Sequence, residues 1–412
     1  MGALNKIKSD VIWIATGRLM FAFSQWLVIV YLSRTVGVED LGLYTYSIAL
    51  VSPLIMFSQM NMRMYLVTDA KDKFASNDYY STRLLATAIA LTILVMLMFF
   101  KNADYSFYIC LAGVALIKAV ESISDVVLGF LQKHGDMKLV SISNILKGVS
   151  SLVVMISAIY IFDSMILGVF AIAISWLMIL FLYDISKCKK LSIDFSFNSK
   201  NIKDLVIVCI PLGLIMALIN YGFNIPVYII ENDLGIEKVG VFSAIFYFLV
   251  MGRLVAGSVI QAIAPRVSRV FSSHDTRLMY KVFMVLVLSG FFVATIGVLI
   301  AYYVGDMVLG FVYGEVFMEY TGVFVIIMIA AGVGFINQFI GLILTSIRSF
   351  KSMLFTHGVQ VLIVFVSAYM LVPIYGIEGA AQSLVYGNLV LLLLNVFVFV
   401  LHMNRTSNLR II

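Results

Sequence analysis

Residues Gly37–Tyr44 read GVEDLGLY, and 198 residues later Gly235–Phe242 read GIEKVGVF. Glycine, glutamate and glycine recur at the same spacing, and the apolar positions match in type. Each stretch lies between the first two long apolar segments of one half of the chain. Chance similarity of two hairpin loops is the alternative, but the matching positions favour an internal duplication.

Long apolar segments bounded by charged residues extend outward from both stretches. Hydrophobic residues make up 62% of the 412 residues and charged residues only 12%, against roughly 25% charged residues in soluble domains. One membrane helix takes about 20 mostly apolar residues. The composition therefore excludes a water-soluble protein and predicts an all-α polytopic membrane protein with twelve transmembrane helices. The predicted spans are 11–33, 41–66, 82–100, 105–132, 139–161, 164–183, 205–230, 239–263, 282–304, 321–347, 353–374 and 379–401.

The loops on the two sides of the predicted bundle differ in charge. With a cytoplasmic amino terminus, the opposite side holds only Arg34, Lys101 and Lys238 among the loop lysines and arginines. The positive-inside rule then places both termini in the cytoplasm. The first span is too long for a signal-peptide core, so we expect it to stay as a helix.

Six spans in each half return the chain to its starting side, so both halves enter the membrane in the same orientation. This predicts a parallel pseudo-two-fold axis along the membrane normal, with a substrate path between the halves. We predict an N-terminal six-helix lobe at 1–183, a cytoplasmic linker at 184–203 and a C-terminal six-helix lobe at 204–412.

Six charged side chains fall at mid-depth in the predicted spans, where each costs about 2.5–3.5 kcal/mol on insertion scales. Such residues normally face a polar interior and mark a pathway. Their excess of positive charge predicts an anion cavity, because guanidinium groups bind phosphate through paired hydrogen bonds. The candidates for substrate binding are Arg18, Lys118, Lys147 and Arg253. The candidates for proton or sodium coupling, or for ion pairing, are Glu121 and Asp125.

The charges on the fourth and fifth spans also allow a structural interpretation. Lys118, Glu121 and Asp125 share one helical face at 100° per residue. Lys147 falls level with Asp125 across the short turn between the spans. Lys118 and Glu121 would then form one interior ion pair, and Lys147 and Asp125 a second, holding the two helices together.

Five further polar residues are candidates for lining the cavity or its mouth. Gln25 shares a helical face with the arginine of the first span, and Asn220 and Asn224 are about one turn apart. Interhelical hydrogen bonding is the commoner role of such amides. Arg63 and Arg83 lie near cytoplasmic span ends, where arginines also snorkel to lipid headgroups.

Catalytic and cofactor motifs are missing from the chain. It has no G-x-x-x-x-G-K-[ST], no H-E-x-x-H and no G-x-S-x-G, and its four histidines stand alone. We therefore predict no catalytic residue, no metal and no cofactor. The short basic clusters argue against nucleic-acid binding, and the longest predicted outside loop, 305–320, is too small to be a domain. Transport is the remaining function class.

Five segments carry a resemblance to a known family over nearly the whole chain. They are LSRTVGVEDLGLYTYSIAL (Leu32–Leu50), MNMRMYLVTDAKDK (Met60–Lys73), NIKDLVIVCIPLGL (Asn201–Leu214), RLVAGSVIQAIAPRVSR (Arg253–Arg269) and PIYGIEGAAQS (Pro373–Ser383). In these the chain resembles the Wzx-type polysaccharide (O-antigen) flippases of the multidrug, oligosaccharidyl-lipid and polysaccharide exporter superfamily.

The resemblance implies a MATE-like fold whose two lobes enclose a V-shaped cavity. It implies alternating access that moves a polyprenyl-diphosphate-linked oligosaccharide, an O-antigen or capsule repeat unit, across the bacterial inner membrane during polysaccharide or lipopolysaccharide biosynthesis. Basic cavity residues of such families engage the diphosphate, and by depth and charge this role falls on the four substrate-binding candidates. The implied partners are the lipid-linked oligosaccharide, membrane lipids, the polysaccharide polymerase and the chain-length machinery. Proton or sodium coupling stays open.

Two alternatives remain from the sequence. The first is a cation-coupled multidrug exporter of the same superfamily, which generally carries acidic residues in its N-terminal lobe. Here the first span carries Arg18 instead, and positive embedded charge suits an anionic cargo better than a cationic drug. The second alternative is a membrane-embedded enzyme or assembly factor of polysaccharide synthesis.

Overall fold

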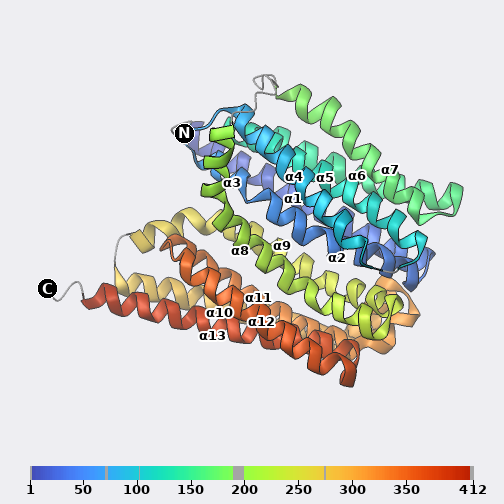
Figure 1. Cartoon of the computed structure of the whole chain (residues 1–412). Coiled ribbons are helices and arrows are strands. Elements are labelled where there is room, and N and C mark those ends of the chain that lie inside the picture. Colours follow the sequence, from blue (N-terminus) through green and yellow to red (C-terminus); the bar gives the residue numbers. More distant parts are fainter. Residues whose placement is uncertain (1, 70–72, 102, 189–198, 273–274, 409–412) are drawn as a thin grey trace. The chain divides into compact units, whose positions relative to one another are not determined.

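The computed structural model describes residues 2–69, 73–101, 103–188, 199–272 and 275–408, which are helical almost throughout and contain no β-strand (Figure 1). The α-helices are α1 (Gly2–Thr35), α2 (Val38–Gln59), α3 (Met62–Thr68), α4 (Ser76–Met98), α5 (Tyr105–Lys133), α6 (Met137–Phe162), α7 (Met165–Ile179), α8 (Ser199–Leu234), α9 (Ile236–Ser272), α10 (Thr276–Tyr313), α11 (Thr321–Ser346), α12 (Phe350–Tyr375) and α13 (Ile377–Asn408). A π-helical turn, η1 (Leu180–Ile185), follows α7, and a 3₁₀ segment, η2 (Glu315–Tyr320), precedes α11.

Every predicted span has a helical counterpart. Among the described residues, eleven helical segments are long and apolar enough to cross a membrane. The one predicted span outside these eleven is α5, a continuous helix of 29 residues that carries Lys118, Glu121 and Asp125. The chain is an all-helical, multi-pass membrane protein.

The turns that begin the duplicated stretches share one backbone geometry. Gly37 (φ 91°) precedes α2 and Gly235 (φ 85°) precedes α9, a region of φ that favours glycine. In both turns the glycine carbonyl accepts a hydrogen bond from the N–H four residues later, at 3.3 and 3.4 Å. Gly376 (φ 61°) precedes α13 with the same bond at 3.4 Å and is also followed by an apolar residue and glutamate. The motif therefore occurs three times, each time at the start of a helix.

Contacts divide the chain into two compact units, Met1–Asn220 and Tyr221–Ile412, called here the N-terminal and C-terminal units. The boundary falls within α8 rather than in the predicted linker. Residues 189–198 of that linker lie outside the described residues, residues 199–203 begin α8, and the first linker residues continue the helix after α7. The predicted lobe boundaries and pseudo-two-fold axis stay predictions.

In the N-terminal unit, α1 packs along α6 through small residues. A Cβ at Gly17 would lie 2.7 Å from the Cα of Ser141, and one at Gly148 would lie 3.0 Å from the Cα of Phe21. The two backbones approach closely because glycine leaves this room, which is a common device of membrane helix pairs.

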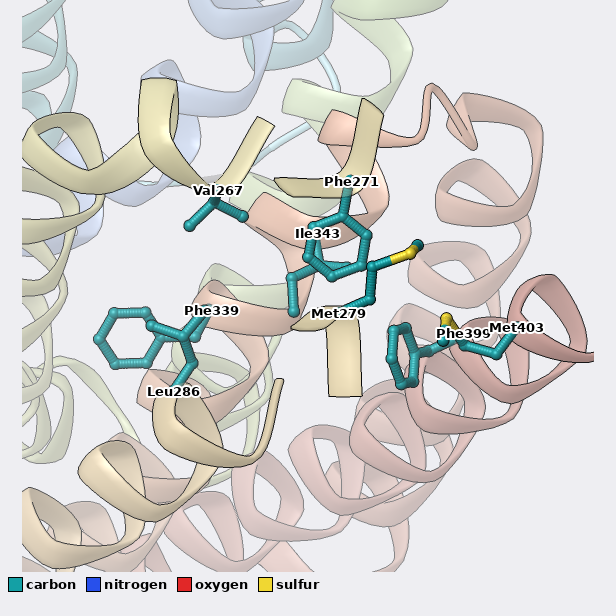
Figure 2. Packing of buried hydrophobic residues seen from close by; sticks show 8 residues of the cluster. All are labelled: Val267, Phe271, Met279, Leu286, Phe339, Ile343, Phe399 and Met403. Atoms are coloured by element: carbon teal, nitrogen blue, oxygen red, sulfur yellow. The ribbon is translucent and has the colours of Figure 1, made fainter. Parts of the chain in front are cut away.

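Aromatic and aliphatic side chains from four helices form a core in the C-terminal unit (Figure 2). The rings of Phe283 and Phe399 stack at 4.2 Å with an interplanar angle of 5°. This core joins α13 to α10 and to α9. Its buried members are Val267, Phe271, Met279, Leu286, Phe339, Ile343, Phe399 and Met403.

Two helices are interrupted within predicted apolar segments. The span 41–66 breaks at Met60 and Asn61, both with positive φ, which separates α2 from α3. In α10 the backbone is non-helical at Val304, but the helix continues to Tyr313. The predicted outside loop at 305–320 is therefore wrong, because its mostly apolar sequence continues as helix and then forms η2.

Candidate functional site

Asp125 of α5 lies between two arginines in the N-terminal unit. Its Oδ1 accepts a hydrogen bond from Nη1 of Arg63 at 3.0 Å, and its Oδ2 accepts one from Nη2 of Arg83 at 3.2 Å. Nε and Nη2 of Arg63 both donate to Oε1 of Gln132, at 3.0 and 2.9 Å. Asp125 and Gln132 are two helical turns apart and so share one face of α5. Two cations around one carboxylate leave this cluster positively charged.

Local backbone features place Arg63 at this cluster. It lies in α3, directly after the break at Met60 and Asn61. On α5, a Cβ at Gly129 would lie 3.1 Å from Cγ of Arg63, so glycine leaves room for the arginine stem to pass. A Cβ at Gly213 of α8 would lie 3.0 Å from Cα of Met60, so the backbone of α8 comes close to the break at this point.

Arg83 does not snorkel, since its side chain is 0% exposed. The residue is near a span end, but its guanidinium turns inward to Asp125, and its place at a cavity mouth stays a prediction. Its Nε and Nη1 atoms are buried without a hydrogen-bond partner among the described residues, and Nε2 of Gln25 is in the same condition. Buried donors normally have acceptors, so these three nitrogen atoms stand out in the described part of the chain.

Arg18 adds a third guanidinium to the surroundings of this cluster. Its side chain is exposed on α1, and it interacts electrostatically with both Arg63 and Asp125. We call Arg18, Arg63, Arg83 and Asp125 the arginine cluster. With three positive charges and one negative charge, it carries an excess of two positive charges.

Lys147 pairs with Asp184, not with Asp125, so that prediction is wrong. Nζ of Lys147 donates to Oδ2 of Asp184 at 2.8 Å, with the two side chains 5% and 0% exposed. It also donates to Oγ of Ser143 at 3.0 Å and to Oγ of Ser124. An ammonium group has three N–H donors, and all three are used. The structure thus places Lys147 in the packed interior, where it has no donor left for a substrate.

Sequence reasoning missed Asp184 because it stands at the point where the sixth apolar segment ends. It was therefore assigned to the polar linker. In the structure it belongs to η1, a π-helical turn that continues α7 and directs the carboxylate inward. Such turns are frequent at functional sites, but hydropathy does not reveal them.

The predicted pair of Lys118 and Glu121 is confirmed. Nζ of Lys118 lies 2.8 Å from Oε2 of Glu121, and the side chains are 24% and 33% exposed. This half-buried pair lies on α5 one turn before Asp125.

The C-terminal unit contains Arg253 of α9 with its guanidinium 3.8 Å from the centre of the Phe223 ring. No carboxylate among the described residues pairs with it. Arg253 also acts electrostatically on His357 of α12. On α8, Asn220 and Asn224 are half-buried, one turn apart on either side of the boundary between the units.

His357 begins a chain of polar side chains that crosses the C-terminal unit. Its Nδ1 lies 3.0 Å from Oε1 of Gln360, and Nε2 of Gln360 donates to Oδ1 of Asn388 at 2.9 Å. Nδ2 of Asn388 donates to the carbonyl of Ala330 at 3.0 Å, and Nδ2 of Asn337 donates to the carbonyl of Asn388 at 2.8 Å. Sequence reasoning did not select these amides, although their position within apolar spans was a usable signal.

Comparisons with known proteins agree with this architecture. The chain matches the family described as "Polysaccharide biosynthesis protein" over residues 7–271. It is similar to the capsular polysaccharide biosynthesis protein CapF of Staphylococcus aureus, with 26% identity over 383 residues that cover 91% of this chain and 94% of CapF.

Solved structures of MATE and MOP superfamily transporters share the fold. A mutant of the Vibrio cholerae MATE transporter VcmN has a TM-score of 0.67 at 12% identity, covering 98% of this chain and 99% of VcmN. A MOP superfamily transporter from Pyrococcus furiosus has a TM-score of 0.63 at 14% identity, covering 97% and 96% of the two chains. The predicted MATE-like fold is confirmed, and the chain belongs to the polysaccharide biosynthesis protein family.

Proposed function

We propose that this protein is a flippase that moves a polyprenyl-diphosphate-linked oligosaccharide, an O-antigen or capsule repeat unit, across the bacterial inner membrane by alternating access. The observation that carries the proposal is the arginine cluster, in which buried N–H donors of Arg83 have no acceptor among the described residues. Membership of the polysaccharide biosynthesis family and the transporter fold support the same function.

The chemistry of the cluster suits a diphosphate. A diphosphate brings about two negative charges and several acceptor oxygens, and guanidinium groups bind such oxygens through paired hydrogen bonds. In this proposal Arg18, Arg63 and Arg83 bind the diphosphate, and Asp125 holds two of the arginines in position. Lys118 is a weaker candidate for binding the diphosphate, because the carboxylate of Glu121 already neutralises its charge.

A cation-coupled drug exporter receives less support from the same cluster. Exchange of cations needs a carboxylate that is free to bind them, and both oxygens of Asp125 accept hydrogen bonds from arginines. The remaining parts of the proposal are cytoplasmic termini, an inner-membrane location and delivery of the flipped unit to the polysaccharide polymerase and chain-length machinery. Glu121 and Asp125 are the candidates of this proposal for proton or sodium coupling.

The test is transport of a lipid-linked oligosaccharide by the purified full-length chain in lipid vesicles. A glycan-cleaving enzyme added outside reports the fraction of oligosaccharide that has reached the outer leaflet. Loss of a hydrogen bond to a charged group costs about 1.5–3 kcal/mol, or about 10-fold to 100-fold in rate. We expect Arg83→Gln to slow flipping by that factor and Arg34→Gln, the matched control at an exposed arginine of the same unit, to change it less than threefold.

A variant that keeps the local net charge unchanged distinguishes a loss of substrate binding from misfolding. Arg83→Gln combined with Asp125→Asn removes one cation and one anion together, so the arginine cluster keeps its excess of two positive charges. We expect this double variant to insert normally and still to flip slowly. Full flipping by the double variant, or no flipping by the unaltered protein, would contradict the proposal.

A further inference from the structure

We propose that a groove between α12 and α13 binds one anionic phospholipid, with an acyl chain in the groove and the headgroup phosphate at Lys351 and Ser352. The groove has a volume of about 350 Å³ and lies wholly within the C-terminal unit. Its occupant comes from the surrounding membrane and is not the cargo, so the inference does not depend on the proposed function.

Close packing at one end of the helix pair limits the groove to the other end. α12 and α13 run side by side in opposite directions (Figure 1). A Cβ at Gly379 of α13 would overlap the carbonyl oxygen of Leu371. One at Gly387 would overlap Cγ2 of Val364. The two backbones therefore approach closely where α12 ends and α13 begins, as small residues allow in membrane helix pairs.

Larger side chains line the space between the helices at their other end. Nε2 of Gln360 donates to Oδ1 of Asn388 at 2.9 Å, and the groove opens beyond this bond. Phe355, Leu394 and Phe397 form its apolar walls. The side chains of Phe355 and Phe397 are 65% and 58% exposed. In a membrane-spanning helix pair such a surface contacts hydrocarbon, so an acyl chain suits the groove.

The groove also has a polar end. Lys351 is the second residue of α12, a helix of 26 residues that is long enough to cross a membrane. Its ammonium group therefore lies at the depth of lipid headgroups. In the described part of the chain, Lys351 has neither a carboxylate nor another acceptor. Oγ of Ser352 accepts a hydrogen bond from Oγ of Ser349 at 3.0 Å, so its own hydrogen is left to donate.

The charges of the neighbouring helices favour an anion at this end. Residues 321–408, which form α11, α12 and α13, contain a single acidic residue, Glu378. It stands at the start of α13, at the opposite end of the helix pair from Lys351. Arg348, in the turn before α12, adds a second exposed cation. Basic pockets between membrane helices bind anionic headgroups.

The groove suits a phospholipid better than a polyprenyl diphosphate. A phosphodiester carries one negative charge, which one ammonium and one hydroxyl group can bind. A diphosphate carries about two negative charges and suits the paired donors of guanidinium groups, which the arginine cluster provides. We therefore assign the groove to an anionic phospholipid such as phosphatidylglycerol.

Native mass spectrometry of the full-length protein counts the lipid molecules that it retains. Titration with phosphatidylglycerol is compared with titration with phosphatidylcholine, which has the same acyl chains but no net charge. We expect one site with about fivefold higher affinity for phosphatidylglycerol, the contribution of one basic residue at a headgroup. Glycerol 3-phosphate, which has no acyl chain, should not compete.

Two pairs of variants locate the bound lipid. Lys351→Gln should remove the preference for phosphatidylglycerol, while Lys281→Gln, the matched control at an exposed lysine of α10, should keep it. Leu394→Trp fills the groove and should abolish retention of both lipids. Its control is Leu393→Trp at the next residue, which is 70% exposed and does not line the groove.

Several results would overturn the inference. Equal affinity of the unaltered protein for the two lipids contradicts it without any variant. So does an equal loss of preference in Lys351→Gln and Lys281→Gln, or unchanged lipid retention in Leu394→Trp. If a polyprenyl phosphate displaces phosphatidylglycerol at a lower concentration than phosphatidylglycerol itself does, the groove binds the lipid carrier of the cargo. In that case this inference fails while the proposed function stands.

Discussion

Replacing Asp184 by asparagine removes the counter-charge of Lys147 inside the N-terminal unit, and we expect the free energy of unfolding to fall by about 3–5 kcal/mol. The ion pair is 2.8 Å long and both side chains are almost completely buried. Two unit charges about 4 Å apart interact by about 4 kcal/mol at an effective dielectric constant of 20. The neutral amide introduced by Asp184→Asn would also accept the hydrogen bond from Ser124 less strongly than the carboxylate does.

A double-mutant cycle separates the pair from its surroundings. Lys147→Met alone leaves a buried carboxylate and should cost about as much as Asp184→Asn. The double variant leaves no unpaired charge, so its loss should be smaller than the sum of the two single losses by at least about 2 kcal/mol. Reversible unfolding of the protein in mixed micelles, followed by intrinsic fluorescence, measures all four free energies.

The pair of Lys118 and Glu121 provides the matched control for this cycle. It has the same 2.8 Å separation, but its side chains are 24% and 33% exposed. Partly exposed ion pairs contribute about 0.2–1 kcal/mol, so Lys118→Gln and Glu121→Gln should couple by less than about 1 kcal/mol. Additive effects at Lys147 and Asp184, or single losses below about 1 kcal/mol, would refute the reasoning.

Three further predictions concern packing, backbone and reactivity. Gly17→Ala should lower the free energy of unfolding by about 1–3 kcal/mol, because its Cβ would lie 2.7 Å from a backbone atom of α6; Gly341→Ala, with open space around it, should not be destabilising. Gly37→Ala should cost about 1–3 kcal/mol, because φ 91° and ψ 174° are nearly exclusive to glycine. Burial raises the pKa of the Cys188 thiol from 9.0 to about 11. Alkylation of Cys188 by maleimide should therefore be slow at pH 7, and its rate should rise about tenfold per pH unit below that pKa. A cysteine introduced by Ser186→Cys, at an exposed position, should react much faster than Cys188. Equal rates at the two cysteines, or an Ala variant at Gly37 as stable as the parent, would count against the respective argument.

Most of the fold was predictable because membrane helices are determined locally. Twenty or so apolar residues between charges specify a helix wherever they occur, and the loop charges orient it. The interruptions were not predictable in the same way. The break at Met60 and Asn61 and the kink at Val304 depend on backbone angles set by packing, and hydropathy does not give those angles: the first lies inside the predicted span 41–66 and the second at the last residue of the predicted span 282–304.

The sequence predicted several residues of the candidate site but not which of them form ion pairs with one another. Charge and depth selected Arg18, Asp125 and Arg253, and the spacing of three residues correctly paired Lys118 with Glu121. Partners from other helices depend on rotation about each helix axis, which sequence spacing does not give. For that reason the carboxylate assigned to Lys147 was the wrong one.

Because Asp184 lies in the π-helical turn η1, its ion pair with Lys147 depends on the helical geometry of this turn as well as on which residues form it. A π-helical turn accommodates one more residue than an α-helical turn, and an α-helix advances about 100° per residue. An ordinary helix over Leu180–Ile185 would therefore turn Asp184 away from Lys147 by as much as about 100°. A variant that turns this segment into an ordinary α-helix without changing its length would keep every charge of the protein and still leave a lysine buried without its counter-ion.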